Sequence, residues 1–403
     1  MGLGYVGLPL AIEFANAGFM VTGVDLDSSK IRKLKSGLSY VQDVSTDLVR
    51  RHIDSGRLRA TTDFSAIREL DTVKIAVPTP LRKTKDPDMS YVVDATEHVA
   101  KYLHPGMLVI LESTTYPGTT EELLLPKFEK AGLKVGADLF LCFSPERVDP
   151  GNPQYQTRNI PKIVGGITPA CTEMGALFYS QALDRVIPVS STSVAEMVKL
   201  LENNFRMINI GLVNEMAMMC DRMGINVWEV IDAAATKPFG FMPFYPGPGL
   251  GGHCIPIDPF YLSWKTKQSG IEARFIELAG YINGQMPHFV VDKVQQLNQV
   301  RKSVNGSGIH ILGVAYKRDI NDVRESPALD IMHLLEKRGA SVTYSDPYVP
   351  SVRLDGQNWM AQEFAYSVEH ADCVVIVTDH KTFDYAMLVE RANLIVDTRS
   401  LTA

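Results

Sequence analysis

The chain has few cysteines, and none of them lies in a pairing pattern. Among its 403 residues there are five, widely scattered and without a Cys-x-x-Cys pair: Cys142, Cys171, Cys220, Cys254 and Cys373. An odd number at such spacing argues against a disulfide framework and against a zinc site. We therefore expect reduced thiols, a cytoplasmic location and no bound metal.

Positive charge and long apolar runs are also scarce. The net charge of -6 argues against a surface that binds nucleic acid. No apolar run approaches the roughly 18 residues of a membrane span, and no signal-peptide pattern is visible at the start. We expect neither a nucleic-acid nor a membrane partner. The length predicts two or three globular domains.

Glycines are concentrated at the start of the chain. Gly2-Leu-Gly4-Tyr-Val-Gly7 matches Gly-x-Gly-x-x-Gly and is followed by an apolar helical pattern, a strand at residues 19–24, and Asp25. This order is typical of a dinucleotide site, in which the helix N-terminus holds the pyrophosphate. Asp25 would bind the adenosine ribose and repel a 2′-phosphate, which favours NAD over NADP. A plain tight turn is the alternative.

Polar residues follow three further apolar runs. These runs are predicted strands at residues 71–77, 107–111 and 139–143. Each is followed by a polar side chain, namely Thr79, Thr115 and Glu146. Ligands bind beyond the carboxyl ends of the strands in an open parallel sheet, so the three side chains indicate one site. Any one of them alone could be a helix cap.

The glycine fingerprint normally follows a first β-strand at the centre of the sheet. Here only Met1 precedes Gly2. We therefore expect this strand to be absent from the sequence or supplied in another way. Because a central strand buries several apolar side chains at about 1.5–3 kcal/mol each, we expect its loss to weaken the NAD-binding half.

The middle of the chain predicts helices. Ser193 and Glu196 match a capping box that starts a helix reaching about Met223. A second helix is predicted from Glu272 to about residue 281, interrupted near Pro287 and resuming to about residue 301. We expect these helices to form a spacer and a dimerisation surface.

Three polar residues recur along the first of these helices. Lys199 and Asn203 are four residues apart and therefore share one face, and Arg206 falls one turn further along. A solvated polar face is the alternative to a functional one.

A Pro/Gly-rich loop from Phe244 leads into Cys254, with Asp258 four residues later. Prolines 246 and 248 stiffen this segment. Its glycines would let the backbone approach a ligand closely, and they are Gly247, Gly249, Gly251 and Gly252. The pattern is that of a substrate clamp presenting a nucleophile; the alternative is a surface turn with a buried, inert cysteine.

The last third repeats the order strand, helix, strand and acid. The elements are predicted at residues 309–314, 327–338 and 340–344, ending in Asp346. The glycine fingerprint is missing, and Lys317, Arg318 and Arg324 suit phosphate groups better than a second NAD. A solvated charged loop is the alternative.

These elements predict an α/β fold: two Rossmann-like doubly wound domains joined by a long central helix and a helical middle domain. The predicted domains are residues 1–188 for NAD, 189–302 for the helices and the cysteine loop, and 303–403 for the second, degenerate nucleotide-type domain.

Five motifs in one order resemble the UDP-glucose/GDP-mannose dehydrogenase family. They are Gly2 to Gly7, Ser144-Pro-Glu-Arg147, Glu196 to Asn203, Gly251-Gly-His-Cys254-Ile-Pro-Ile-Asp258, and Tyr316-Lys-Arg-Asp319 through Arg324-Glu-Ser326. The resemblance covers nearly the whole chain. Within the family, the stretches at residues 111–121, 144–152 and 235–241 look most similar to bacterial UDP-N-acetylglucosamine 6-dehydrogenases.

The resemblance implies a two-step oxidation of a sugar C6 alcohol to a carboxylate with two NAD. Cys254 would attack the intermediate aldehyde, and the thiohemiacetal would be oxidised to a thioester. Glu146 would serve as base. Lys199 and Asp258 would orient water and stabilise the oxyanion. Thr115 and Asn203 would hold that water or the substrate.

The resemblance also implies the remaining contacts. The cofactor would meet Gly2, Gly4, Tyr5, Val6, Gly7, Asp25, Thr79, Thr115 and Arg324. The nucleotide-sugar would meet Glu146, Arg147, Lys199, Asn203, Arg206, Tyr245, Gly247, Gly249, Gly251, Gly252 and Lys317. We expect a homodimer or higher homo-oligomer.

Three alternatives stay open. UDP-glucose or UDP-N-acetylmannosamine could be the substrate. A single-step 3-hydroxy-acid or phosphogluconate-type dehydrogenase shares the domain order but has no use for Cys254. A truncated chain that only binds a nucleotide-sugar is the alternative without catalysis.

Overall fold

The computed structural model describes residues 1–41, 43–82, 84, 86–149, 151–152, 154–295 and 302–402. The chain forms two compact units. The first comprises Met1–Glu202 with Trp264–Ile271, and the second comprises Asn203–Ser263 with Glu272–Ala403. In the described part of the chain, no helix combines the length and the apolar character needed to cross a membrane.

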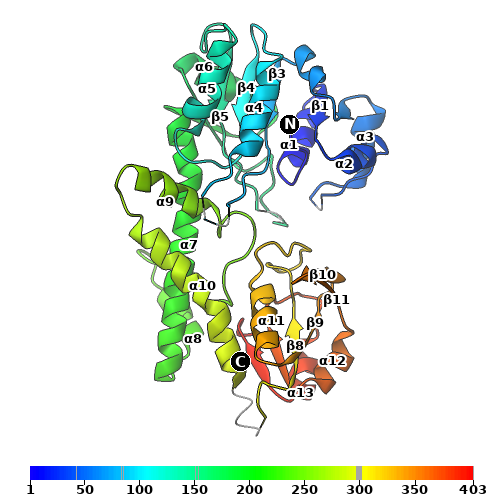
Figure 1. Ribbon diagram of the computed structural model, residues 1–403, viewed down its shortest axis with the longest axis vertical. Coiled ribbons are helices and arrows are strands. Elements are labelled where there is room, and N and C mark those ends of the chain that lie inside the picture. Colours follow the sequence, from blue (N-terminus) through cyan, green and yellow to red (C-terminus); the bar gives the residue numbers. More distant parts are fainter. Residues whose placement is uncertain are drawn as a thin grey trace. The chain divides into compact units, whose positions relative to one another are not determined.

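The main sheet of the first unit has five strands in the order β3-β4-β5-β6-β7, and Figure 1 labels β3, β4 and β5. They are β3 Thr72–Ile75, β4 Leu108–Leu111, β5 Phe140–Phe143, β6 Lys162–Gly166 and β7 Val186–Val189. Only the β5–β6 pair is antiparallel. β4 is buried at every position, as expected for a strand of a largely parallel sheet covered on both faces.

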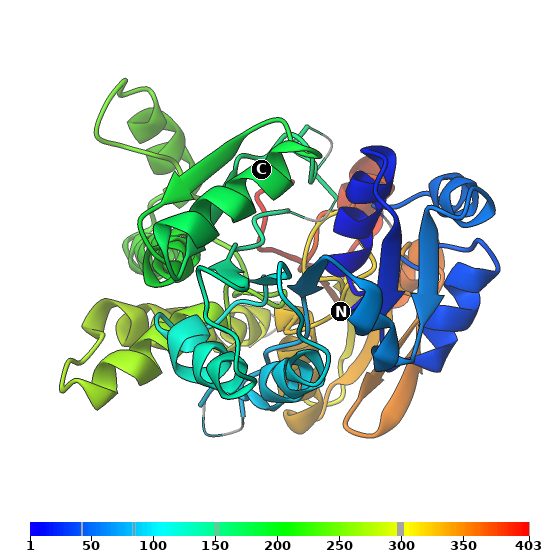
Figure 2. The same cartoon turned by 90° about the horizontal axis from the view of Figure 1, so that it is seen from above.

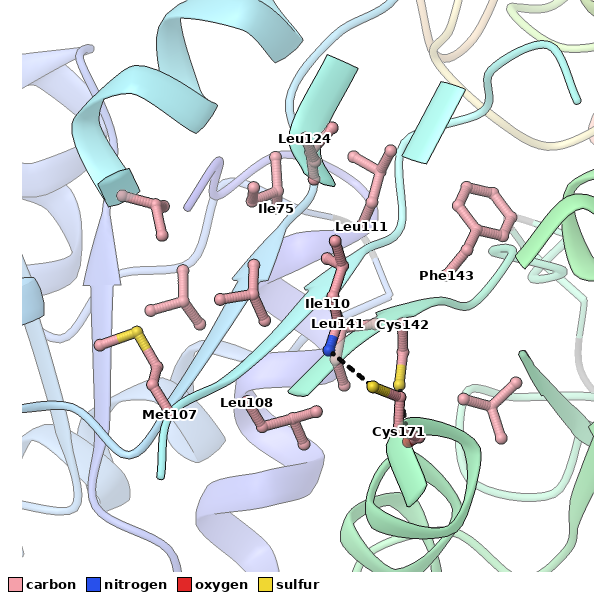
Figure 3. Close-up of a cluster of buried hydrophobic side chains, with 14 of the residues drawn as sticks. Ile75, Met107, Leu108, Ile110, Leu111, Leu124, Leu141, Cys142, Phe143 and Cys171 are labelled. Atoms are coloured by element: carbon pink, nitrogen blue, oxygen red, sulfur yellow. Dashed lines mark hydrogen bonds between the residues drawn. The ribbon is translucent and has the colours of Figure 1, made fainter. Parts of the chain in front are cut away.

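Helices cover this sheet and close its core. The helical segments are η1 Phe64–Glu69, α4 Ser90–Ala100, η2 Thr120–Leu124, α5 Leu125–Lys130 and α6 Pro169–Ser180. Figure 3 shows apolar side chains of β3, β4 and β5 packed together, with the amide of Leu141 donating to the sulfur of Cys171 on α6 at 3.4 Å. Burial of these side chains provides the main stabilisation of the sheet.

A second, two-stranded parallel sheet precedes it. Its strands are β1 Val21–Val24 and β2 Leu58–Thr61, and the accompanying helices are α1 Gly7–Asn16, α2 Ser28–Lys35 and α3 Thr46–Asp54. Residues 1–6, all of which are described, form no strand.

The first two residues lie between strand β1 of the small sheet and strand β3 of the main sheet, and this end of the chain is marked N in Figure 2. Met1 donates to the carbonyl of Lys74 at 2.8 Å and accepts from the amide of Ala76 at 2.9 Å. Gly2 donates to the carbonyl of Val24 at 2.8 Å. Through these three bonds residues 1 and 2 join the end of β1 to the end of β3, at the position where the fingerprint's first strand normally lies.

The long central helix is confirmed as α7 Thr192–Met223. The predicted capping box is wrong. The hydroxyl of Ser191 accepts from the amide of Val194 at 3.2 Å, and the helix begins one residue before Ser193. The Glu196 carboxylate turns away from the helix start and accepts from the amides of Gly118 and Thr120.

Three further helices follow α7, namely α8 Val227–Ala235, α9 Asp258–Gln268 and α10 Arg274–Val294. The predicted interruption at Pro287 is wrong, because α10 continues through it. Burial of one face of α10, Pro287 included, offsets the lost backbone hydrogen bond. α10 lies alongside α7, where a Cβ on Gly211 would stand 3.2 Å from the Ala279 Cβ (Figure 1). The predicted extension over residues 296–301 lies outside the described residues.

The C-terminal part is a four-stranded parallel sheet in the order β13-β12-β8-β9. Its strands are β8 Gly308–Leu312, β9 Ser341–Ser345, β12 Cys373–Ile376 and β13 Ile395–Asp397. The other elements are α11 Pro327–Lys337, α12 Phe364–His370, α13 Tyr385–Arg391 and the antiparallel pair β10 Ser351–Leu354 with β11 Gln357–Met360. The predicted fold class is therefore confirmed: parallel sheets with helices, in two Rossmann-like arrangements.

Candidate functional site

The N-terminal glycine loop leaves open space only at its middle glycine. Gly2 has φ +82°, and a Cβ there would lie 2.4 Å from the carbonyl oxygen of Ala76. A Cβ on Gly7 would lie 1.8 Å from the oxygen of Gly2, whereas at Gly4 no atom lies within 4 Å. Glycine is therefore required at positions 2 and 7 because a side chain there would clash with neighbouring backbone. At Gly4 the absence of a side chain leaves room for a ligand to approach the backbone.

Helix α1 begins directly behind this loop. Its N-cap residue, Val6, makes no side-chain capping bond, the amide of Leu8 donates to the carbonyl of Gly4 at 3.1 Å, and the positive end of the helix dipole faces the loop, where it favours an anion. Tyr5 beside it is 40% exposed. The loop and the helix start thus fit the pyrophosphate of a dinucleotide.

Asp25 follows β1 and is held in place by three donors. Its Oδ2 accepts from the amide of Leu3 at 2.8 Å and pairs with the Nζ of Lys30 at 3.3 Å, and its Oδ1 accepts from the amide of Asp27 at 2.9 Å. The carboxylate is therefore fixed beside the glycine loop, where the sequence placed the ribose contact.

Two threonines follow the strands of the main sheet. Thr79, after β3, and Thr115, after β4, are both buried. The Oγ1 of Thr115 has no hydrogen-bond partner among the described residues. A buried hydroxyl without a hydrogen-bond partner destabilises the fold unless a ligand or a water molecule supplies that partner. This supports the predicted place of Thr115 in a binding site.

Glu146, after β5, is a largely buried carboxylate, 13% exposed, and both of its oxygens have donors. Its Oε1 accepts from the amides of Arg147 and Val148, both at 2.8 Å, and its Oε2 accepts from the Nζ of Lys162 at 3.2 Å. Burial raises the pKa of Glu146, but the charge of Lys162 and the backbone hydrogen bonds outweigh burial, so the pKa is lowered overall. Glu146 is thus an ionised hydrogen-bond acceptor and a weak base.

Arg147 is turned toward helix α7. It forms a two-pronged ion pair with Glu202, at 3.2 Å from Nε and 2.6 Å from Nη2, and its Nη1 donates to the carbonyl of Pro161 at 2.7 Å. These contacts fix the loop that carries Glu146. The substrate contact expected for Arg147 stays a prediction.

Lys199 lies buried on α7, one turn before Asn203. Glu196, also buried, binds the 118–120 loop through the bonds already described and through the hydroxyl of Thr120 at 2.8 Å. Burial raises the pKa of Glu196 to about 7. Arg206, one turn beyond Asn203, is exposed.

Cys254 stands at the start of the turn that leads into α9. It is the one exposed cysteine of the five, so the alternative of a buried, inert thiol is wrong. Its carbonyl accepts from the amides of Ile257 and Asp258, at 3.1 and 2.8 Å. Asp258 is buried, and its Oδ2 accepts from the Nδ2 of Asn203 at 2.6 Å. The backbone of Cys254, the acid of Asp258 and the amide of Asn203 are therefore connected within one unit.

The glycines of the Pro/Gly loop face the C-terminal sheet domain of the same unit. A Cβ on Gly251 would lie 2.5 Å from the Cβ of Tyr316, and one on Gly252 would lie 2.9 Å from its ring. Gly249, at φ +139°, would meet Pro327 at 3.1 Å. The loop needs glycine for these close contacts. The prediction attributed the glycines to ligand approach, and this internal packing was not foreseen.

A buried chain of amides anchors the start of that loop. The amide of Gly247 donates to the Oδ1 of Asn214 on α7 at 2.9 Å. The Nδ2 of Asn214 donates to Asn283 on α10 at 2.8 Å, and Asn283 donates to the carbonyl of Met207 at 3.2 Å. Neither asparagine was predicted from the sequence, although each is a polar residue inside an apolar helical stripe.

The basic residues of the C-terminal loop are partly engaged. Arg324 donates to Asp322 from Nε at 3.0 Å and from Nη2 at 2.6 Å, and Arg318 pairs with Asp379. The carbonyl of Arg324 accepts from the amide of Gly252 at 2.9 Å. Lys317 lies in the same loop.

Tyr245, predicted to contact substrate, is partly exposed. Its hydroxyl donates to Asp232 at 2.8 Å, and its ring stacks on Trp228 with centroids 5.5 Å apart.

The structure thus places the predicted residues in two groups. The first unit holds the glycine loop, Asp25, Thr79, Thr115, Glu146 and Lys199, and the second holds Asn203, Cys254, Asp258 and the basic loop. Among the residues that the structure describes, no group of three or more His, Cys, Asp or Glu side chains is arranged to hold a metal ion.

Models of the UDP-glucose/GDP-mannose dehydrogenase family match the chain in three parts. The NAD-binding domain matches residues 1–183, the central domain residues 193–285, and the UDP-binding domain residues 310–403. The chain belongs to this family. It is thus an NAD-dependent nucleotide-sugar dehydrogenase, and the glycine loop, Asp25 and the α1 N-terminus fit the NAD that the family binds.

Relatives with different substrates in their names match equally well. A UDP-N-acetyl-D-glucosamine 6-dehydrogenase of Pseudomonas aeruginosa is 36% identical over 87% of this chain and 82% of its own length. An NDP-N-acetyl-D-galactosaminuronic acid dehydrogenase of Ralstonia nicotianae is 35% identical over 100% of this chain and 95% of its own. The solved structure of a UDP-D-ManNAc dehydrogenase from Pyrococcus horikoshii has a TM-score of 0.90 and 33% identity, covering 99% of this chain and 94% of that one.

Proposed function

We propose that this dehydrogenase oxidises the C6 hydroxyl of a UDP-N-acetylhexosamine to the uronic acid. Within this class, the proposed substrate is UDP-N-acetylglucosamine. The observation that carries the proposal is the exposed Cys254 one turn before the buried Asp258–Asn203 pair. An alcohol oxidation that stops at the aldehyde needs no thiol, whereas oxidation to the acid is helped by a nucleophile that retains the aldehyde.

In this mechanism NAD supplies the hydride acceptor for both oxidation steps. Cys254 attacks the aldehyde carbon with its sulfur and holds the sugar as a thiohemiacetal, which becomes a thioester when its hydride leaves. Water then forms a bond to the thioester carbon as the carbon–sulfur bond breaks. The thiolate is restored and the acid is released.

The other residues orient and stabilise. Lys199 and Asn203, on one face of α7, stabilise the oxyanion and hold the water, and Asp258 fixes the Asn203 amide through their bond of 2.6 Å. Glu146, ionised and fixed by its own donors, orients that water. The Thr115 hydroxyl, lacking a protein partner among the described residues, supplies a further bond to water or substrate.

We further propose that residues 1–188, 189–302 and 303–403 supply the NAD site, the thiol and the UDP site, respectively. Lys317 would bind the nucleotide-sugar and Arg324 the cofactor pyrophosphate. The scattered, mostly buried cysteines support a cytoplasmic location.

A second copy of the chain is the proposed partner. Its support is an apolar row along α7 at spacings of four and seven residues, formed by Leu201, Phe205, Leu212, Met219 and Met223, which are 44–66% exposed. An exposed apolar row of this length on one helix is suited to pairing with the same row of another copy.

The test counts NADH on a panel of nucleotide-sugars: UDP-N-acetylglucosamine, its galactosamine and mannosamine epimers, and UDP-glucose. We expect two NADH for each molecule of UDP-N-acetylglucosamine and slower turnover of the others. One NADH per substrate would support the single-step alternative. A clear preference for another sugar would reject the glucosamine assignment. Cys254→Ala should abolish acid formation while UDP-sugar binding, measured by calorimetry, persists.

A further inference from the structure

Glu146 stands at the end of a buried chain of charged groups in the first unit. Lys162, the first residue of β6, lies between Glu146, 3.2 Å from its Nζ, and Glu112, 3.7 Å from it. Glu112 follows β4 and also pairs with the Nζ of Lys74 on β3 at 2.9 Å. The Tyr179 hydroxyl on α6 donates to the same Glu112 oxygen. Five elements, namely β3, β4, β5, β6 and α6, therefore each contribute one polar group to this buried cluster.

The charged atoms of this cluster are buried on the side away from Glu146, where the Nζ of Lys74 is inaccessible although its side chain is 16% exposed. The side chain of Glu112 has no exposed surface, and that of Lys162 is only 6% exposed. Aromatic rings surround Lys74, whose Nζ lies 4.5 Å from the ring centre of Phe14 and 4.7 Å from that of Tyr179. Two buried carboxylates share one buried ammonium group, so removing Lys162 leaves both of them with less compensation.

The donors of Glu146 fix its orientation as well as its charge. The two backbone amides approach one oxygen, and Lys162 approaches the other. A carboxylate offers about four acceptor positions, and these donors occupy three of them. The Glu146 side chain remains 13% accessible, so a further donor can reach it.

We propose that Lys162, shared between Glu112 and Glu146, is the positioning residue that keeps Glu146 ionised and oriented to accept a hydrogen bond from the reacting water or hydroxyl. This inference rests on the proposed function for the identity of the group that donates to Glu146. The placement of the charges depends on the structure alone. It assigns a purpose to a lysine buried in an otherwise apolar strand.

The charges around Glu146 agree with this assignment. Burial would raise the pKa of its carboxyl, and Lys162 leads the opposing causes that leave it lowered. Burial likewise opposes the charge of Lys162, but Glu112 and Glu146 outweigh it and raise the pKa of Lys162. Lys74, one group further away, has its pKa lowered by burial to about 8. The Arg147 side chain is engaged by Glu202 and does not replace Lys162.

The experiment titrates the Glu146 carboxyl by infrared difference spectroscopy, with Glu146→Gln subtracted to assign its band. In Lys162→Met we expect the titration to move up by about 1–3 pH units, as for removal of a charge at this distance. Lys162→Arg, which keeps the charge, should restore the low titration. An unchanged Glu146 titration in folded Lys162→Met would overturn the inference.

Glu112→Gln is the second variant, and it tests the same inference should Lys162→Met fail to fold. It removes the other carboxylate that pairs with Lys162, so the midpoint of the Glu146 titration should move to lower pH or stay unchanged. A rise would contradict the shared-lysine arrangement. In the profile of kcat/KM against pH, the midpoint of the acidic limb should move to higher pH in Lys162→Met. It should not move to higher pH in Glu112→Gln.

The proposed function and the role of Lys162 can be refuted independently of each other. The infrared titration needs no turnover, so a wild-type chain that forms no NADH on any sugar would retire the proposed function and leave the titration result standing. Normal NADH counting with an unmoved Glu146 titration in Lys162→Met would retire only the role of Lys162.

Discussion

The Nδ2 atom of Asn203 donates to the Oδ2 atom of Asp258 at 2.6 Å, and both side chains are buried. This bond joins the middle of α7 to the first residue of α9. The amide of Asp258 also donates to the carbonyl of Cys254, so the orientation of the cysteine turn is tied to helix α7 through a single carboxylate.

Asn203→Ala should therefore destabilise the second unit. The substitution leaves a buried carboxylate without one of its donors, which costs about 1–3 kcal/mol. Urea unfolding at neutral pH measures the change. Asn209→Ala is the matched control, because the Asn209 amide on the same helix donates to the carbonyl of Phe205 at the surface. Equal losses for the two variants would show that the Asp258 contact contributes nothing beyond an ordinary surface bond.

Gly251→Ala should disturb the packing of the cysteine loop. The added methyl group would lie 2.5 Å from the Cβ of Tyr316 and 3.1 Å from the carbonyl oxygen of Glu325, so backbone must move. We expect a loss of about 1–3 kcal/mol, as for overpacking, and a lower turnover number. Tyr316→Gly added to this variant should restore part of the stability.

Gly284→Ala provides the comparison for that substitution. Gly284 lies inside α10, and no atom lies within 4 Å of its Cβ position. Here alanine should stabilise the chain by up to about 1 kcal/mol through helix propensity. Destabilisation of both variants to the same extent would argue against the Tyr316 contact as the cause.

Much of this fold could be predicted because its strands and helices are locally encoded. The apolar run at residues 107–111 became β4, and the period of apolar residues after Ser190 became α7 within about two residues. Asp25 was found because an acid after the second strand is part of a fixed spacing. Cys254 and Asp258 were singled out by the Pro/Gly-rich loop that precedes the thiol and by the motif shared with the family.

Other features depend on contacts between distant segments and could not be predicted locally. Glu196 has the spacing of a capping box, yet its carboxylate binds the amides of a loop that lies 76–78 residues earlier. Pro287 is a helix breaker by propensity, and tertiary burial overrides it. Lys162 could have been singled out as a lone charge at the start of an apolar strand, but its partners become visible only when β4, β5 and β6 are brought together.

The pH dependence of stability should reveal the buried Glu196. Its folded pKa of about 7 lies above the ordinary 4.5, so the folded state binds more protons than the unfolded state between these values. Stability from this group is full below about pH 4.5 and falls as pH rises toward 7, by an amount on the order of 3 kcal/mol. The stability of Glu196→Gln minus that of wild type should therefore increase over this window. Urea unfolding at several pH values measures it.

Glu97→Gln is the control for that titration. Glu97 is exposed, and its bond to Lys127 leads the causes that lower its pKa, so its contribution changes only below its ordinary value. The difference between this variant and wild type should stay level between about pH 4.5 and 7. A level difference for Glu196→Gln as well would contradict the burial of an ionisable group in the 118–120 contact.

Leu212→Glu should disrupt the proposed self-association. Leu212 is 54% exposed in the middle of the apolar row on α7, and a charge placed there would be buried without a partner if two copies pair along this helix. Light scattering should report a dimer or larger species for the wild type and a smaller one for the variant. Leu177→Glu, at a 57% exposed leucine on α6, changes the same residue type outside the row and should leave the mass unchanged. A wild-type mass equal to one chain would refute the partner proposal, and a dimer that survives Leu212→Glu would place the interface on another surface.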